Sequence, residues 1–220
     1  MDTLRASCPW DARQTHESLA PHLLEESYEA LDALESGDLA ALQDELGDVL
    51  LQVVFHARIA AERTDATRFT IDDVAEGIVA KLIRRHPHVF GDVTVSGPDE
   101  VKANWDAIKA AERAEAGEAE ASMLDSVPFT QPALALAAQL QRRAERAGAP
   151  AELVGLPDEG AGEGGEAAGA GVSDIGAELF ALVARAREAG LDPELELRAA
   201  ARRYRDLVRA WEQSEHRQSR

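Results

Sequence analysis

The sequence feature that most constrains the fold is an acidic stretch with a glycine at its centre. Between Leu24 and Asp48 the chain carries nine carboxylates and neither lysine nor arginine. Gly37 lies at the midpoint of a symmetric set of acids. If residues 36–38 form a tight turn between two antiparallel helices, residues equidistant from the turn lie at the same height on facing helices. The stretch therefore predicts a helical hairpin.

Four of these acids mirror one another about Gly37. In the predicted hairpin Glu29 faces Glu45 and Glu26 faces Asp48, and a spacing of three within each helix keeps each pair on one side. Four converging carboxylates repel one another strongly unless a cation lies between them. Mg²⁺ takes oxygen ligands and is usually held by a few carboxylates, water and substrate phosphate. We therefore expect these four side chains to bind Mg²⁺.

The rest of the chain also predicts helices, because helix formers dominate, aromatic residues are only 5% and no strand pattern is present. We expect residues 1–17 to be irregular, a helix 18–35 capped by Ser18, and a helix 38–63 that begins at Asp38. Thr70 and Asp73 predict a capping box before a third helix. Leu24, Tyr28 and Leu31 mark an apolar stripe on the first helix, and Val74, Ile78 and Leu82 repeat at helical spacing on the third. On the second helix five apolar residues are expected to face inward: Leu42, Leu46, Val49, Val53 and Ala57.

A dense basic cluster closes the third predicted helix. Lys81 and Arg85 are four residues apart on one face, and Pro87 ends the helix. Cations in a last helical turn commonly complement the helix dipole. The alternative is recognition of substrate phosphate, with the two side chains offsetting charge that metal ions leave uncompensated. Both interpretations stay open at this point.

The chain is expected to form two tandem helical units, 1–117 and 118–220, with a shorter helix around Trp105 in the first. In the second we expect helices 133–147, 174–189 and 193–212 and a flexible glycine-rich linker, 157–171. Shifting the chain by 129 residues places 45–60 over 174–189 with many matching apolar positions, but Asp48 meets Ala177. The second unit is therefore interpreted as a degenerate copy that lost its carboxylates.

The net charge of −18 argues against a partner that is a nucleic-acid polymer, since phosphate backbones are bound by clustered Lys and Arg. The lone Cys8 excludes an internal disulfide. The longest apolar run is too short to span a membrane, and the first residues lack the apolar core of a signal peptide. A cytoplasmic location is the default expectation.

Several motifs of residues 8–113 resemble the MazG family of nucleoside triphosphate pyrophosphohydrolases. The family pattern EExxE followed by ExxD matches Glu25, Glu26 and Glu29, then Glu45 and Asp48. The segments CPWDARQTH, ELGDVLLQVVFHA, KLIRRHPHVFGD and NWDAIKAAER match in the family's order.

The resemblance implies an all-α MazG-like bundle, completed as a four-helix bundle by dimerisation. It also implies Mg²⁺-dependent hydrolysis of NTPs or dNTPs to a nucleoside monophosphate and pyrophosphate, with Mn²⁺ as a substitute and nucleotide-pool housecleaning as the role. By motif position, Glu26, Glu29, Glu45 and Asp48 match the metal ligands, and Glu25 the additional acid, which orients or deprotonates water or supports the ligands. Lys81 and Arg85 match the phosphate-contacting pair.

Three alternatives remain open from the sequence. A non-catalytic helical scaffold that senses nucleotides or binds a partner would also account for the degenerate second unit. A narrower specificity within the same chemistry, for one deoxynucleotide or a phosphoribosyl nucleotide, is a closer alternative. Finally, the first unit cannot bury its apolar stripes alone, so it pairs either with the second unit or with another chain, as in a homodimer.

Overall fold

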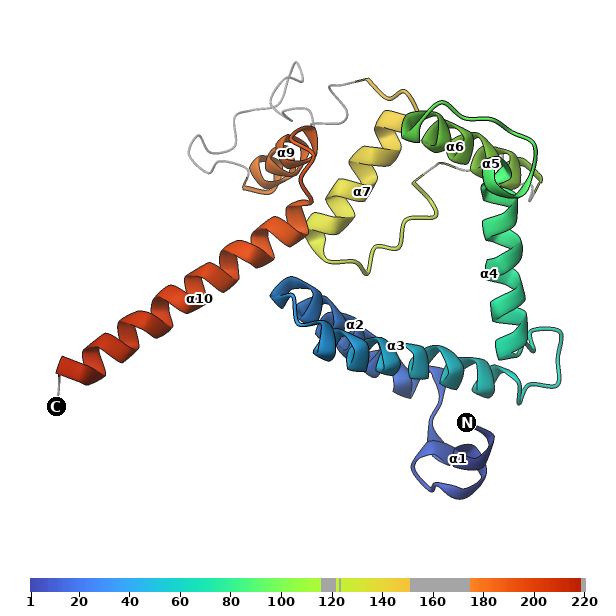
Figure 1. Ribbon diagram of the computed structural model, residues 1–220, viewed down its shortest axis with the longest axis horizontal. Helices are drawn as coiled ribbons and strands as arrows, with labels where there is room; N and C mark the ends of the chain where they lie inside the picture. Colours follow the sequence, from blue (N-terminus) through green and yellow to red (C-terminus); the bar gives the residue numbers. More distant parts are fainter. Residues whose placement is uncertain (116–121, 123, 151–174, 219–220) are drawn as a thin grey trace, which may run out of the picture. The chain divides into compact units, whose positions relative to one another are not determined.

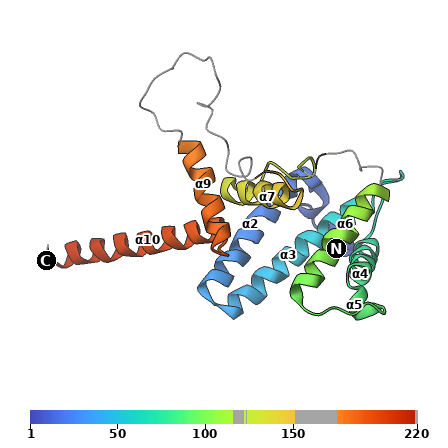
Figure 2. The ribbon, with the colours of Figure 1, turned by 90° about the horizontal axis from the view of Figure 1, so that it is seen from above.

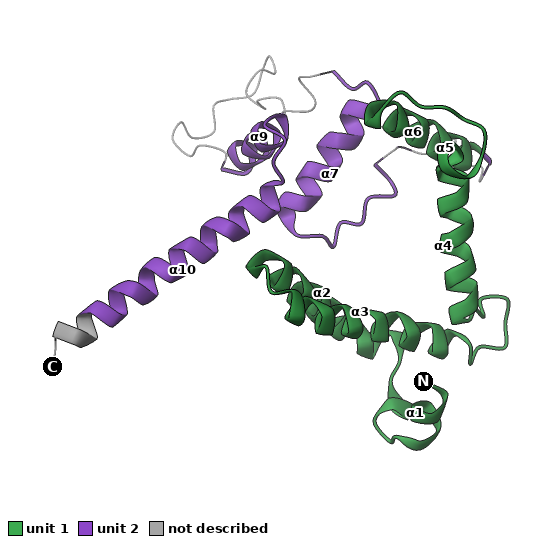
Figure 3. Ribbon diagram, viewed as in Figure 1, with its two compact units in different colours: residues 1–114 green, residues 115–220 purple. Residues whose placement is uncertain are grey.

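A computed structural model describes residues 1–115, 122, 124–150 and 175–218 (Figure 1). Within these ranges every regular element is a helix, which confirms the all-α prediction. The chain divides into two compact units, residues 1–114 and 115–220 (Figure 3). The predicted glycine-rich linker, 157–171, lies outside the described residues.

The N-terminal segment is ordered, so the prediction that residues 1–17 are irregular was wrong. Helix α1 spans Asp2–Ser7 and a short 3₁₀ helix, η1, spans Asp11–Arg13. The side chain of Arg5 is only 9% exposed. It forms an ion pair of 2.6 Å with Glu62 and donates to the backbone oxygens of Asp11 and Gln14. A polar network that sequence spacing does not reveal therefore anchors the segment.

Helix α2 spans His16–Ser36 and begins two residues earlier than predicted. Thr15 is the N-cap, and it forms a capping box in which its side chain accepts from the Ser18 backbone N–H while the Ser18 side chain accepts from the Thr15 N–H. Ser18 is thus the third helical residue, and its predicted role as the cap was wrong. The helix ends at Gly37, whose φ of 74° is left-handed and favours glycine.

Helix α3 spans Leu39–Ala60 and packs antiparallel against α2 (Figures 1 and 2). Asp38 caps it as predicted, because its carboxylate accepts from the backbone N–H groups of Ala40 and Ala41. The helix ends three residues before the predicted end at Arg63. The turn at residues 36–38 therefore closes the hairpin that the sequence predicts.

The buried side of the hairpin differs from the predicted apolar stripes. Leu46 and Val53 were expected to face inward, yet both are exposed, as are Leu24 and Tyr28 of the apolar stripe on the first helix. A pair of helices can bury only the seam between them, so an apolar stripe outside the seam needs another partner. The buried apolar residues of the hairpin are Leu19, Ala30, Ala33, Phe55, Ala57 and Ala60.

Three further helices complete the first unit. Helix α4 spans Ile71–Arg85 and starts at the predicted capping box of Thr70 and Asp73. Helix α5 spans Pro87–Phe90, and α6 spans Pro98–Glu115, longer than the short helix expected around Trp105. Val74, Ile78 and Leu82, which repeat at helical spacing on α4, are exposed in this chain, as is Ile71.

The second unit contains α7 at Ala133–Arg146, α9 at Ile175–Glu188 and α10 at Pro193–Gln218, close to the predicted ranges except that α10 is longer. Gln141 of α7 is buried against α9, where its side chain donates to the Phe180 carbonyl and accepts from Arg187. None of the helices in the described ranges combines the length and apolar character that crossing a membrane requires.

Candidate functional site

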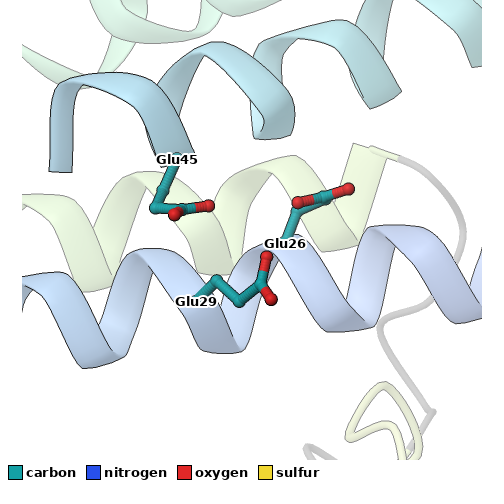
Figure 4. Close-up of side chains that lie close together, drawn as sticks. All are labelled: Glu26, Glu29 and Glu45. Carbon is teal, nitrogen blue, oxygen red and sulfur yellow. The ribbon is translucent and has the colours of Figure 1, made fainter. Parts of the chain in front are cut away.

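Three carboxylates meet across the helical hairpin. Glu26 and Glu29 come from α2 and Glu45 comes from α3 (Figure 4). Each offers one oxygen, and the three oxygens lie within 4.8 Å of one another. The register follows from the left-handed turn at Gly37, which sets equidistant residues of the two helices against each other. We call these three side chains the acidic cluster.

Two carboxyl groups of the acidic cluster, those of Glu26 and Glu45, have raised pKa values. Partial burial and then the charges of Asp48 and Glu29 raise the pKa of Glu26 above 4.5. Partial burial, followed by the charges of Glu29 and Asp48, also raises the pKa of Glu45. Burial and neighbouring negative charge both disfavour an ionised carboxyl. The neighbours that shift these two pKa values are all carboxylates, so negative charges are gathered at this point of the hairpin.

This donor set suits a hard divalent cation. The acidic cluster is the one group of three or more candidate metal-ligating side chains among the described residues. Its donors are all carboxylate oxygens, as Mg²⁺ prefers, and none is a thiolate or an imidazole. Carboxylates that approach this closely without a cation are electrostatically strained. The residues present therefore fit a bound Mg²⁺.

The two other predicted acids lie beside the acidic cluster. Asp48 is not part of the group of three, but its negative charge contributes to the raised pKa of both Glu26 and Glu45. Glu25 also contributes to the raised pKa of Glu26, while its own carboxylate is exposed and lies 3.6 Å from His22 Nδ1. The structure thus gathers three predicted ligands and places the other two acids at the edge.

The predicted basic pair is not part of the acidic cluster. Arg85 is the last residue of α4, which leads away from the hairpin, and Lys81 lies one turn earlier (Figure 1). Arg85 Nη2 instead donates to Glu112 Oε2 on α6 at 2.7 Å. The position of Arg85 at the helix end is compatible with the dipole interpretation as well as with phosphate recognition.

One contributor to this basic end was missed from the sequence. Glu112 accepts from Arg84 Nε and from Arg85 Nη2. Trp105 lies seven residues earlier on the same helix, and its ring meets His86 edge-on with 4.9 Å between centroids. The spacing of Trp105, Lys109 and Glu112 by four and three residues would have placed them on one face of a helix. That periodicity was the available signal.

Comparisons with known proteins cover both units. Residues 14–90 match a family model described as the MazG nucleotide pyrophosphohydrolase domain. The "Uncharacterized 26.1 kDa protein in blaB 3′region" of Streptomyces cacaoi is 47% identical over 96% of this chain and 79% of its own length. The nucleoside triphosphate pyrophosphohydrolase of Escherichia coli K12 is 39% identical over 92% of this chain and 81% of its own length.

A protein of the same name from Mycobacterium tuberculosis H37Rv is 49% identical over 70% of this chain but only 45% of its own length. The chain therefore spans about four fifths of two of these relatives and less than half of the third.

Proposed function

This chain belongs to the MazG family of nucleotide pyrophosphohydrolases, which are hydrolases, and from that membership we propose that it hydrolyses nucleoside triphosphates to a nucleoside monophosphate and pyrophosphate. We include deoxynucleoside triphosphates among the substrates and propose a housecleaning role in the nucleotide pool of the cytoplasm. A site that recognises the triphosphate through a metal binds the part that all of these molecules share, which supports a broad substrate range.

The proposal is carried by the convergence of Glu26, Glu29 and Glu45 from two helices onto one point. In this proposal the three carboxylates hold Mg²⁺, with Mn²⁺ as a substitute, and Asp48 completes the ligand set from the edge of the cluster. A divalent cation held there would neutralise charge on the triphosphate and make water a better nucleophile. The protein supplies the fixed array of oxygens through the register of its hairpin.

The remaining residues act on the water and on the phosphates. Glu25 orients the attacking water or accepts its proton, or it supports the neighbouring ligand Glu26. Its exposed carboxylate at the edge of the acidic cluster suits each of these roles. Lys81 and Arg85 bind the phosphate oxygens through charge-assisted hydrogen bonds.

We propose further that the active form is a homodimer. The hairpin and α4 expose apolar residues at helical spacing, among them Leu46, Leu50, Ile78 and Leu82. Large apolar side chains exposed along one face of a helix are typical of protein interfaces. A second copy that covers these faces would complete a helical bundle around the hairpin.

The decisive experiment measures pyrophosphate release from the common NTPs and dNTPs, with Mg²⁺, with Mn²⁺ and with a chelator. Turnover of several triphosphates that requires the metal, with monophosphate and pyrophosphate formed in equal amounts, would support the proposal. Orthophosphate as the product would contradict it. Nucleotide binding without turnover would favour a non-catalytic scaffold, and turnover of a single nucleotide would favour the narrower specificity.

A further inference from the structure

The basic end of α4 is tied to α6 by a single carboxylate. Glu112 Oε1 accepts from Arg84 Nε at 2.6 Å, and Glu112 Oε2 accepts from Arg85 Nη2 at 2.7 Å. The two arginines are adjacent in sequence, whereas Glu112 lies 27 residues beyond Arg85 on another helix. Each oxygen of the Glu112 carboxylate therefore accepts a hydrogen bond from a different guanidinium group.

The two arms of this bridge differ in exposure. The side chains of Arg85 and Glu112 are 27% and 22% exposed, whereas that of Arg84 is 54% exposed. Hydrogen bonds from both arginines lower the pKa of Glu112 to about 2, so the carboxylate is ionised throughout the neutral range. The Glu112–Arg85 arm is thus the sheltered one, and the Arg84 arm lies mainly in solvent, where ion pairs contribute little.

Arg85 is held at one end of its guanidinium. Glu112 accepts a hydrogen bond from Nη2 of Arg85. The Nε atom of Arg85 is buried and has no hydrogen-bond partner in the described parts of the chain. A free arginine side chain loses much rotamer freedom when it binds an anion, and a side chain that is already held loses less. Fixing Arg85 in advance should therefore favour phosphate binding.

The charge of Glu112 also acts in the opposite direction, because an anion beside Arg85 competes with phosphate. Arg84 offsets this effect, since two guanidinium groups share one carboxylate and the three side chains keep a net charge of +1. The carboxylate is therefore neutralised without consuming the charge of Arg85. Orientation, and not competition, is the effect that this arrangement favours.

We propose that Glu112 is a positioning residue that fixes the guanidinium of Arg85 in advance for binding the triphosphate of the substrate. The proposal rests on the proposed function, because it requires that Arg85 bind substrate phosphate. Glu112 acts through Arg85 and has no contact with the reacting atoms. Its removal should weaken substrate binding and leave the chemical step intact.

The test compares Glu112→Gln, Glu112→Asp and Arg84→Gln with the full-length wild-type protein in Mg²⁺ and one NTP that it hydrolyses. We expect Glu112→Gln to raise KM roughly 3- to 30-fold at nearly constant kcat, a range set by the rotamer freedom of one arginine. Glu112→Asp, which keeps the charge on a shorter side chain, should fall between it and wild type. Arg84→Gln keeps the Glu112–Arg85 pair and removes only the more exposed charge that offsets Glu112, so it should raise KM by clearly less than Glu112→Gln does.

The outcomes separate the two proposals. Absence of triphosphate hydrolysis in wild type would overturn the proposed function itself. An active wild type with an unchanged KM in Glu112→Gln would overturn only the positioning role, and a lowered KM would show that Glu112 competes with substrate. Equal increases of KM in Glu112→Gln and Arg84→Gln would mean that Glu112 only holds α4 and α6 together. Thermal melting followed by circular dichroism establishes that each variant is folded. Because Glu112 stays ionised, the KM difference should be the same at pH 6.5 and pH 8.5.

Discussion

Glu29 on α2 and Glu45 on α3 lie opposite each other across the hairpin, and an oxygen of each carboxylate lies within 4.8 Å of the other. Glu29 precedes Gly37 by eight residues and Glu45 follows it by eight. A left-handed glycine between two capped helices thus aligns acids that are sixteen residues apart in sequence. The turn sets the register of the acidic cluster, and its chemistry depends on that register.

The first prediction concerns the acidic cluster itself. Glu45→Gln and Glu29→Gln each remove a charged oxygen ligand while keeping the size of the side chain. We expect pyrophosphate release with Mg²⁺ to fall at least about 100-fold, since even changes around metal ligands commonly cost 10- to 100-fold. Circular dichroism should show unchanged helix content. Full activity in either folded variant would contradict the assignment of that residue.

The second prediction concerns stability without metal. The pKa values of Glu26 and Glu45 are raised in the folded protein, so above about pH 4.5 the folded state holds protons that the unfolded state has released. Stability is then lost as pH rises through this window, and the loss persists at pH 7. In a chelator at pH 7, Glu45→Gln should therefore melt at a higher temperature than wild type. A lower melting temperature for this variant would argue against charge repulsion in the cluster.

The third prediction reverses the second by adding the metal. A ligand that binds only the folded state stabilises it by about 2.7 kcal/mol at a concentration 100 times its Kd. Mg²⁺ should therefore raise the melting temperature of the wild type in differential scanning fluorimetry, and Glu45→Gln should respond far less. K⁺ at matched ionic strength is the control for screening. Equal responses of wild type and variant to Mg²⁺ would place the metal elsewhere.

Local chemistry made the hairpin predictable from sequence. Gly37 and Asp38 mark a helix stop and a helix start, and each acts within a few residues. The start of α2 was harder, because Thr15 and Ser18 are both good caps and they cooperate in one capping box. The pattern of capping residues gave the elements and their register, with errors of a few residues at the ends.

Contacts between distant segments were not predictable in the same way. Periodicity identified Leu46 and Ile78 as members of apolar stripes, but it carries no information on whether the same chain covers those stripes. The ion pair between Arg85 and Glu112 joins helices whose relative placement depends on the intervening α5 segment. Sequence spacing relates residues on one helix or across a tight turn. The contacts that cover an apolar stripe or join α4 to α6 lie between segments that no such spacing relates.

The fourth prediction tests the homodimer. Ile78 lies on the exposed apolar face of α4, and Ala80 is exposed on the opposite side of the helix, since two residues turn an α-helix by about 200°. Ile78→Glu should dissociate the dimer, whereas Ala80→Glu should leave it intact. Sedimentation velocity at several concentrations measures the mass of each form. A monomeric wild type, or a dimeric Ile78→Glu, would contradict the assigned interface.

The last prediction concerns a histidine pair at the base of the hairpin. His16 begins α2 and His56 lies near the end of α3, with 2.8 Å between their Nδ1 atoms. The rings are stacked, with an interplanar angle of 1°. At this separation one Nδ1 must donate and the other accept, so the contact requires at least one neutral ring. Protonation of both rings would break it.

Burial, and then the charge of His16, lowers the pKa of His56 below its ordinary value of 6.5. Between that value and the lower folded pKa, the unfolded state binds more protons than the folded state, so stability falls as the pH falls. The slope is at most about 1.4 kcal/mol per pH unit, the value for one proton. His56→Asn cannot titrate, yet its amide can still pair with His16, so stability should fall less steeply below pH 6.5. Urea unfolding of the wild type and His56→Asn from pH 5 to pH 8 measures how the free energy of unfolding depends on pH. Parallel profiles for the two proteins would mean that the histidine pair does not govern this dependence.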